Sequence, residues 1–130
     1  MRTSHSRKGF PELIQEPDAA EALAWLKEAD DPEERSISGG DGSDTAWLGQ
    51  EAVEIVQKIY ALGAVSVTAV EIEGRVEGAT HQDTSSLIIE LPEDAVKRAC
   101  LFAWQAGFAL SNGWASASDT GQTHLLIWRD

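Results

Sequence analysis

The chain has 130 residues, of which 42% are hydrophobic and 25% are charged, as in an ordinary globular domain. Its net charge of −12 disfavours binding to nucleic-acid phosphates and to anionic membrane surfaces. The length suits one domain with a sizeable core, and an acidic surface by itself indicates no more than solubility.

The N-terminal end differs in charge from the rest of the chain. Residues 1–10 contain arginine and lysine but no acid, whereas the remainder is strongly acidic. We expect 1–16 to be a mobile arm and 17–130 to be a single domain that includes an N-terminal helix.

That first helix is predicted over 18–30 from apolar residues spaced three and four apart. Asp18 is its expected N-cap, and Glu21 stands three residues later, as in a capping box. Pro32 disfavours helical geometry at the residue before it, so the helix is expected to end near Asp30.

A short strand at 35–38 and a second helix are predicted next. The acidic, glycine-rich stretch 39–44 is typical of a loop, and Asp44 or Thr45 can cap the helix that follows. This helix is expected to reach Leu62, where Gly63 is well placed to end it.

The second half of the chain predicts two strands, a long helix and a last strand. The first strand covers 65–73, and its alternation slips in a way that a bulge near Ala69 would reconcile. The second covers 86–91. Pro92-Glu93-Asp94 opens the long helix, Asn112-Gly113 ends it, and the last strand covers 124–129.

With the strand at 35–38, the order of elements becomes β-α-β-β-α-β, the ferredoxin-like pattern, preceded by an N-terminal helical extension. This α+β arrangement predicts that two helices cover one face of the sheet. It also predicts that the first and third strands are central, and that the second and last are edges.

The long helix contains an unusually apolar stretch, ACLFAWQAGFAL over 99–110. A helix that is apolar all round is covered on more than one side. Small residues repeat every four positions on one face, Ala99, Ala103 and Gly107. Larger ones line another face, Leu101, Trp104 and Phe108. One face is expected to rest on the sheet, and the other needs a cover.

Two covers are open at this point: the helix over 18–30, or a second copy of the chain. We favour self-association, because the strands also carry apolar residues on both faces. The residues expected at such an interface are Leu101, Trp104, Phe108, Leu126 and Trp128. The alternative is a monomer that the N-terminal segment wraps.

Candidate chemical groups are few. His81 and Asp83 share a polar connection and suggest a metal-assisted enzyme, although no third ligand is identifiable. Trp114 lies in a loop of small residues that, with the loop 39–44, suggests a gate over a small-molecule ligand. No catalytic residue, cofactor or metal site is predicted, since no motif for one is present.

Cys100, the single cysteine, permits no internal disulfide and no thiolate zinc site, and in the apolar helix it is expected to act as a small hydrophobe. No signal peptide is visible, and the apolar stretch is too short to span a bilayer, so a cytoplasmic location is expected. The sequence therefore predicts a non-enzymatic interaction or regulatory module whose partner is itself or another protein. A small-molecule-binding regulatory domain and a metal-assisted enzyme are the alternatives.

Overall fold

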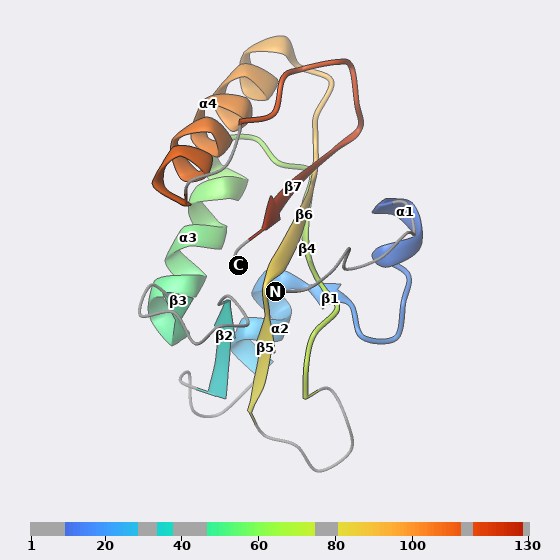
Figure 1. The fold of residues 1–130 in the computed structure, drawn as a ribbon, viewed down its shortest axis with the longest axis vertical. Coiled ribbons are helices and arrows are strands. Elements are labelled where there is room, and N and C mark those ends of the chain that lie inside the picture. Colours follow the sequence, from blue (N-terminus) through green and yellow to red (C-terminus); the bar gives the residue numbers. More distant parts are fainter. Residues whose placement is uncertain (1–9, 29–33, 38–46, 75–80, 113–115, 129–130) are drawn as a thin grey trace.

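The chain has an α+β architecture, seen in a computed structural model that describes residues 10–28, 34–37, 47–74, 81–112 and 116–128. A four-stranded antiparallel sheet has the order β1-β4-β6-β7, and a smaller sheet has the order β3-β2-β5. Helices α3 (Gly49–Ala61) and α4 (Ala95–Asn112) lie on one side of the larger sheet, and the short α1 (Phe10–Leu13) lies on the other (Figure 1).

A bent hairpin links the two sheets. Strands β4 (Ser66–Val70) and β6 (Ser86–Glu90) pair in the larger sheet, and the same register continues below them to a bridge between Glu73 and Asp83. The bend lies between these pairings, where Glu71 has φ of 51°. Thr84 Oγ1 holds the bend by donating to the Val70 carbonyl at 2.6 Å.

The predicted bulge near Ala69 is wrong, because Ala69 pairs with Leu87 in an unbroken register. The slip in the hydrophobic alternation instead reflects Glu71, whose left-handed backbone turns the chain after β4 has ended. The predicted polar connection also holds a strand, β5 (Gln82–Thr84), which forms the lower arm of the bent hairpin.

The predicted strand at 35–38 is present as β2 (Arg35–Ile37), and Ser38 lies outside the described residues. β2 pairs in parallel with β5 and antiparallel with β3 (Trp47–Leu48). It therefore belongs to the smaller sheet and not to the larger one.

The ferredoxin-like strand order is not confirmed, although the α+β class is. In that order the first predicted strand would stand between the third and the last. Here β7 (His124–Trp128) pairs along the whole of β6, and this leaves β2 only the lower arm of the hairpin, at β5. The second predicted strand, β4, is central because β1 (Ala20–Glu21) occupies its outer edge.

The N-terminal helix is shorter than predicted, as α2 (Ala22–Glu28), and residues 29–30 lie outside the described part. It begins later because the chain just before it pairs with β4 as β1. Glu21, not Asp18, is the N-cap: its carboxylate accepts the backbone N–H groups of Leu23 at 3.1 Å and Ala24 at 2.7 Å.

The predicted arm over 1–16 contains α1 in its described part. Leu13, in this helix, is buried with Val70 and Ile88 in a small cluster on the sheet face away from α3 and α4. The division into an arm and a domain stays a prediction, since residues 1–9 lie outside the described part.

The second helix ends at the predicted glycine. Gly63 has φ of 121°, its N–H donates to Tyr60 O at 2.9 Å, and the N–H of Ala64 donates to Ile59 O at 3.4 Å. These bonds form a Schellman motif, which favours glycine at the left-handed residue. The start differs from the prediction, because Trp47 and Leu48 form β3 before α3 begins.

The main core lies between the larger sheet and the helices on its face, and it includes side chains from α2, α3 and α4. Asp94 caps α4, because its side chain accepts the Lys97 N–H at 2.9 Å and its carbonyl accepts the Arg98 N–H at 3.0 Å. α4 lies at the upper end of the molecule, whereas α2 lies near its middle, close to β1 and β4 (Figure 1). The predicted N-terminal helix, which is α2, therefore does not cover α4.

Candidate functional site

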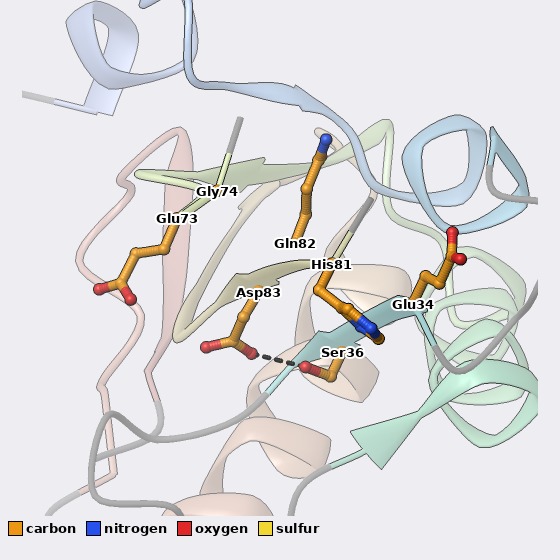
Figure 2. A pocket seen from close by; sticks show the side chains of 7 residues that line it. All are labelled: Glu34, Ser36, Glu73, Gly74, His81, Gln82 and Asp83. Carbon is orange, nitrogen blue, oxygen red and sulfur yellow. Dashed lines mark hydrogen bonds between the residues drawn. The ribbon is translucent and has the colours of Figure 1, made fainter. Parts of the chain in front are cut away.

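An open pocket of about 280 Å³ lies at the lower arm of the bent hairpin, beside β2 (Figure 2). It is lined by residues in or next to β2 and β5 and in the segment that follows β4: Glu34, Ser36, Glu73, Gly74, His81, Gln82 and Asp83. Three of these seven residues are acidic, Glu34, Glu73 and Asp83.

Strand pairing places these groups. Ser36 stands opposite Asp83 in the parallel pairing of β2 with β5, and its hydroxyl donates to Asp83 Oδ1 at 2.8 Å. Glu73 is joined to Asp83 by two backbone hydrogen bonds, of 2.7 Å and 3.1 Å. His81 and Asp83 are two residues apart along an extended segment and point to the same side of it (Figure 2).

Gln82 points the opposite way from His81 and Asp83 (Figure 2). Its Oε1 accepts the indole N–H of Trp25 at 2.8 Å in a buried contact. The Arg35 guanidinium lies over the same indole ring, 6.0 Å from its centroid, and forms an ion pair with Glu28 at 3.2 Å. The Gln82 side chain is thus held by the buried Trp25, which the buried Arg35 also contacts.

The structure brings the predicted pair His81 and Asp83 into this one pocket. Within the described ranges, no group of three or more histidine, cysteine, aspartate or glutamate residues is placed to hold a metal ion. Glu34 and Glu73 line different sides of the pocket (Figure 2). His124 pairs with Glu90 at the far end of β6, well away from Asp83.

The sequence did identify His81 and Asp83 but not Ser36 or Glu34 as their neighbours. Those two residues reach the pocket only through the parallel pairing of β2 with β5, which joins segments far apart in the chain. The predicted strand at 35–38 was the one signal that could have found them, because alternate residues of a strand, such as Glu34 and Ser36, lie on one face.

The predicted interface residues of α4 lie mainly inside the protein. Leu101 is fully buried and Phe108 is 8% exposed, and both belong to the main core. Trp104 is half-buried and stacks on Phe108 with ring centroids 5.6 Å apart, and Trp47 approaches Phe108 at 5.2 Å. Side chains so deeply enclosed leave little surface for a partner, so an interface on α4 must use its other face.

The remaining predicted residues lie elsewhere. Leu126 is half-buried and packs against the cluster of Leu13, Val70 and Ile88. The side chain of Trp128 lies outside the described part, as do Trp114 and the loop over 39–44. The expectation of a tryptophan gate over a ligand therefore stays a prediction.

The exposed face of α4 is the one that carries the small residues. Ala99, Ala103 and Gly107 are all exposed, and so is Cys100, contrary to the expectation that this thiol packs as a hydrophobe. Larger apolar side chains stand at both ends of the face, Val96 at 72% exposed and Leu110 at 83%. We call these six residues the α4 face.

Charge is nearly absent from α4, although the chain has 22 acidic and 10 basic residues. The helix carries only Lys97 and Arg98, both near its start. Arg98 forms an ion pair with Asp119 at 2.6 Å and donates to the carbonyls of Pro92 and Gln122. The hydrogen bond from Arg98 lowers the pKa of Asp119, and the same contact raises that of Arg98. From Ala99 onward the helix is uncharged.

No protein-family model matches the chain, and neither a curated protein nor a solved structure is detectably similar to it. None of the helices in the described ranges has the length and apolar character needed to cross a membrane. The pocket and the α4 face are therefore the two candidate functional regions of the described chain.

Proposed function

We propose that this protein is a small non-enzymatic interaction module that self-associates through the α4 face. The observation that carries the proposal is the exposure of Val96 and Leu110, at 72% and 83%, on a helix face without charge. Exposed contiguous apolar surface rimmed by polar residues is typical of interaction sites. A cytoplasmic location is part of this proposal.

The energetics favour a weak and reversible association. Burying a valine or leucine side chain contributes roughly 1.5–3 kcal/mol, and a pair of copies would bury Val96 and Leu110 from each. Association costs several kcal/mol in lost freedom of motion, which offsets much of that gain. We therefore expect a dissociation constant in the range of tens to hundreds of micromolar, not a permanent dimer.

The test is light scattering after gel filtration, at protein concentrations from a few to hundreds of micromolar. We expect the wild-type mass to rise from that of a monomer toward that of a dimer. Leu110→Glu should keep the chain monomeric, because it places a carboxylate in the contact. Val65→Glu is the matched control, since Val65 is also exposed, at 55%, but lies outside α4. A wild-type mass that stays monomeric throughout would refute the proposal.

A second candidate is a small-molecule regulatory site, favoured by the pocket that contains Asp83, Glu73 and His81. Its carboxylates suit a small cationic ligand, such as a polyamine or a basic amino acid. Calorimetric titration with such amines should give saturable heat that Asp83→Asn reduces and His124→Gln, away from the pocket, leaves unchanged. Absence of heat with the wild-type protein would remove this candidate.

Calorimetric titration also distinguishes the metal-assisted enzyme from the small-molecule regulatory site. Titration with zinc, manganese and calcium should give heat and a thermal shift if His81 and Asp83 bind a metal ion. Neither effect is expected here, because the described residues place no third ligand beside that pair. Saturable zinc binding that His81→Ala abolishes would restore the enzyme hypothesis.

A further inference from the structure

We infer that residues 10–17, which include α1, form a detachable strap over an apolar strip on the rear face of the larger sheet. The rear face is the one away from α3 and α4 (Figure 1). The strip consists of Val70 from β4, Ile88 from β6 and Leu126 from β7. Opening of the strap controls whether this strip is accessible. The inference does not depend on the α4 face.

Strand register makes the strip continuous. Ile88 stands opposite Leu126 in the pairing of β6 with β7, and opposite Thr68 in the pairing of β6 with β4. Val70 lies two residues beyond Thr68, and alternate residues of a strand share a face. The three apolar side chains are therefore neighbours on the rear face. Val70 and Ile88 are almost fully buried in the closed arrangement.

The strap is attached to this strip mainly through one side chain. Leu13, at 7% exposed, is buried in the cluster with Val70 and Ile88, and Ile14 packs against the cluster while half-buried. The helix that carries Leu13 has four residues, about one turn, and a single turn is not stable by itself because helix nucleation is unfavourable. The closed position therefore depends on the apolar contact.

The chain becomes fixed to the sheet just after the strap. The Asp18 carbonyl accepts the Ile72 N–H at 3.0 Å, and the pairing of β1 with β4 begins at Ala20. The backbone bonds that the described residues show within the strap are local, as from the Glu16 N–H to Leu13 O at 3.3 Å. The rear cluster shares no residue with the main core. Opening therefore ends at Asp18 and leaves the sheet and the core in place.

Hydrogen exchange of the full chain under native conditions, resolved by residue with NMR, measures this opening. The amides of Gln15 and Glu16 report the strap, and the amide of Ile72 reports its anchor. Relative to intrinsic rates, we expect the strap amides to exchange at least about tenfold faster than the anchor, because a local opening requires less free energy than disruption of the sheet.

Two variants on the same turn test what holds the strap. Leu13→Ala should accelerate exchange at Gln15 and Glu16 by a further factor of about ten or more, because truncation of a buried leucine strongly weakens its packing. Exchange at Ile72 should change far less. Glu12→Gln, at an exposed side chain, is the matched control and should leave all three rates unchanged. Neither substitution lies next to Gln15 or Glu16, so their intrinsic rates are unaffected.

A second measurement tests whether opening uncovers the strip. Leu13→Ala should bind more of a fluorescent dye that recognises apolar surface than the wild type does, whereas Glu12→Gln should bind the same amount. Dye bound at the α4 face is common to all three proteins and does not affect the comparison.

The outcomes that would overturn the inference are distinct. Strap amides that exchange no faster than Ile72 in the wild type would show that the strap opens only with the sheet. Equal exchange in Leu13→Ala and Glu12→Gln would show that Leu13 does not hold the strap. Equal acceleration of Ile72 and the strap amides in Leu13→Ala would show that the strap is not separable, and unchanged dye binding would refute the uncovered strip.

Discussion

Tyr60 joins three elements through one hydroxyl group. It donates to Glu21 Oε2 at 2.6 Å and accepts the backbone N–H of Val67 at 3.0 Å. Glu21 also caps α2, so Tyr60, at the end of α3, links the start of that helix to β4. The N–H of Val67 lies just beyond the last residue of β4 that pairs with β1, where no strand partner is available to it in the described part.

Removing this hydroxyl should destabilise the fold. Tyr60→Phe leaves the N–H of the buried Val67 without its acceptor, and an unsatisfied buried donor costs about 1–3 kcal/mol. We expect urea unfolding of Tyr60→Phe to show a lower free energy of unfolding by that amount. An unchanged unfolding midpoint would contradict the role given to Tyr60.

The same contact predicts the pH response of Tyr60. Burial, and then its hydrogen bond to Glu21, raise the pKa of Tyr60 from 10.0 to about 12. Stability from this group is therefore fully present below pH 10 and is lost as the pH rises toward 12. The chain has a single tyrosine, so tyrosinate absorbance near 295 nm reports this group alone. We expect its midpoint well above 10, and a midpoint near 10 would count against the contact.

At the scale of elements, Gly63 shows how the end of α3 and the start of α4 depend on each other. A Cβ on Gly63 would lie 2.6 Å from Lys97 Cβ, and the positive φ of this residue already disfavours a side chain. The close contact and the positive φ therefore both oppose a side chain at Gly63.

Two glycine substitutions should therefore have opposite effects on stability. Gly63→Ala should lower the free energy of unfolding by more than about 1 kcal/mol, because both the strain and the clash oppose it. Gly107→Ala, in an open helical position, should raise it by about 0.5–1 kcal/mol. Urea denaturation at low protein concentration measures both without interference from association. Equal effects of the two variants would contradict the different environments described for Gly63 and Gly107.

The helices were more predictable than the short strands. Apolar spacing and the residues that end helices identified α3 with Gly63, and they identified the start of α4 at Asp94. Strands β1 and β3 have two residues each, which is too short for alternation to be visible. The α4 faces were harder to assign, because Gln105, the only polar residue in 99–110, is buried and accepts the Ala117 N–H at 2.9 Å.

For the molecule as a whole, the sequence predicted the α+β class but not the strand order. Hydrophobic patterns indicate which face of a strand is buried, but they do not determine which neighbouring edge it pairs with. In the structure β6 pairs with β7 along its free edge, and β2 pairs with β5. The same limit applied to the pocket, where His81 and Asp83 were predicted and Ser36 required that parallel pairing.

Net charge predicts how association responds to salt. Two copies that each carry −12 repel one another, whereas the α4 face itself is uncharged after Arg98. Added salt screens the repulsion and leaves the apolar contact, so self-association should strengthen between low and physiological ionic strength. Light scattering at fixed protein concentration measures this change. Weaker association at higher salt would indicate a contact held by opposite charges and not by the α4 face.

Sedimentation equilibrium of the wild-type chain beside Leu110→Glu and Val65→Glu measures self-association itself. We predict a monomer–dimer equilibrium for the wild type and for Val65→Glu, with a dissociation constant of tens to hundreds of micromolar, and a monomer for Leu110→Glu. Wild-type protein that sediments as a monomer at hundreds of micromolar, or a Leu110→Glu variant that dimerises as the wild type does, would contradict self-association through the α4 face.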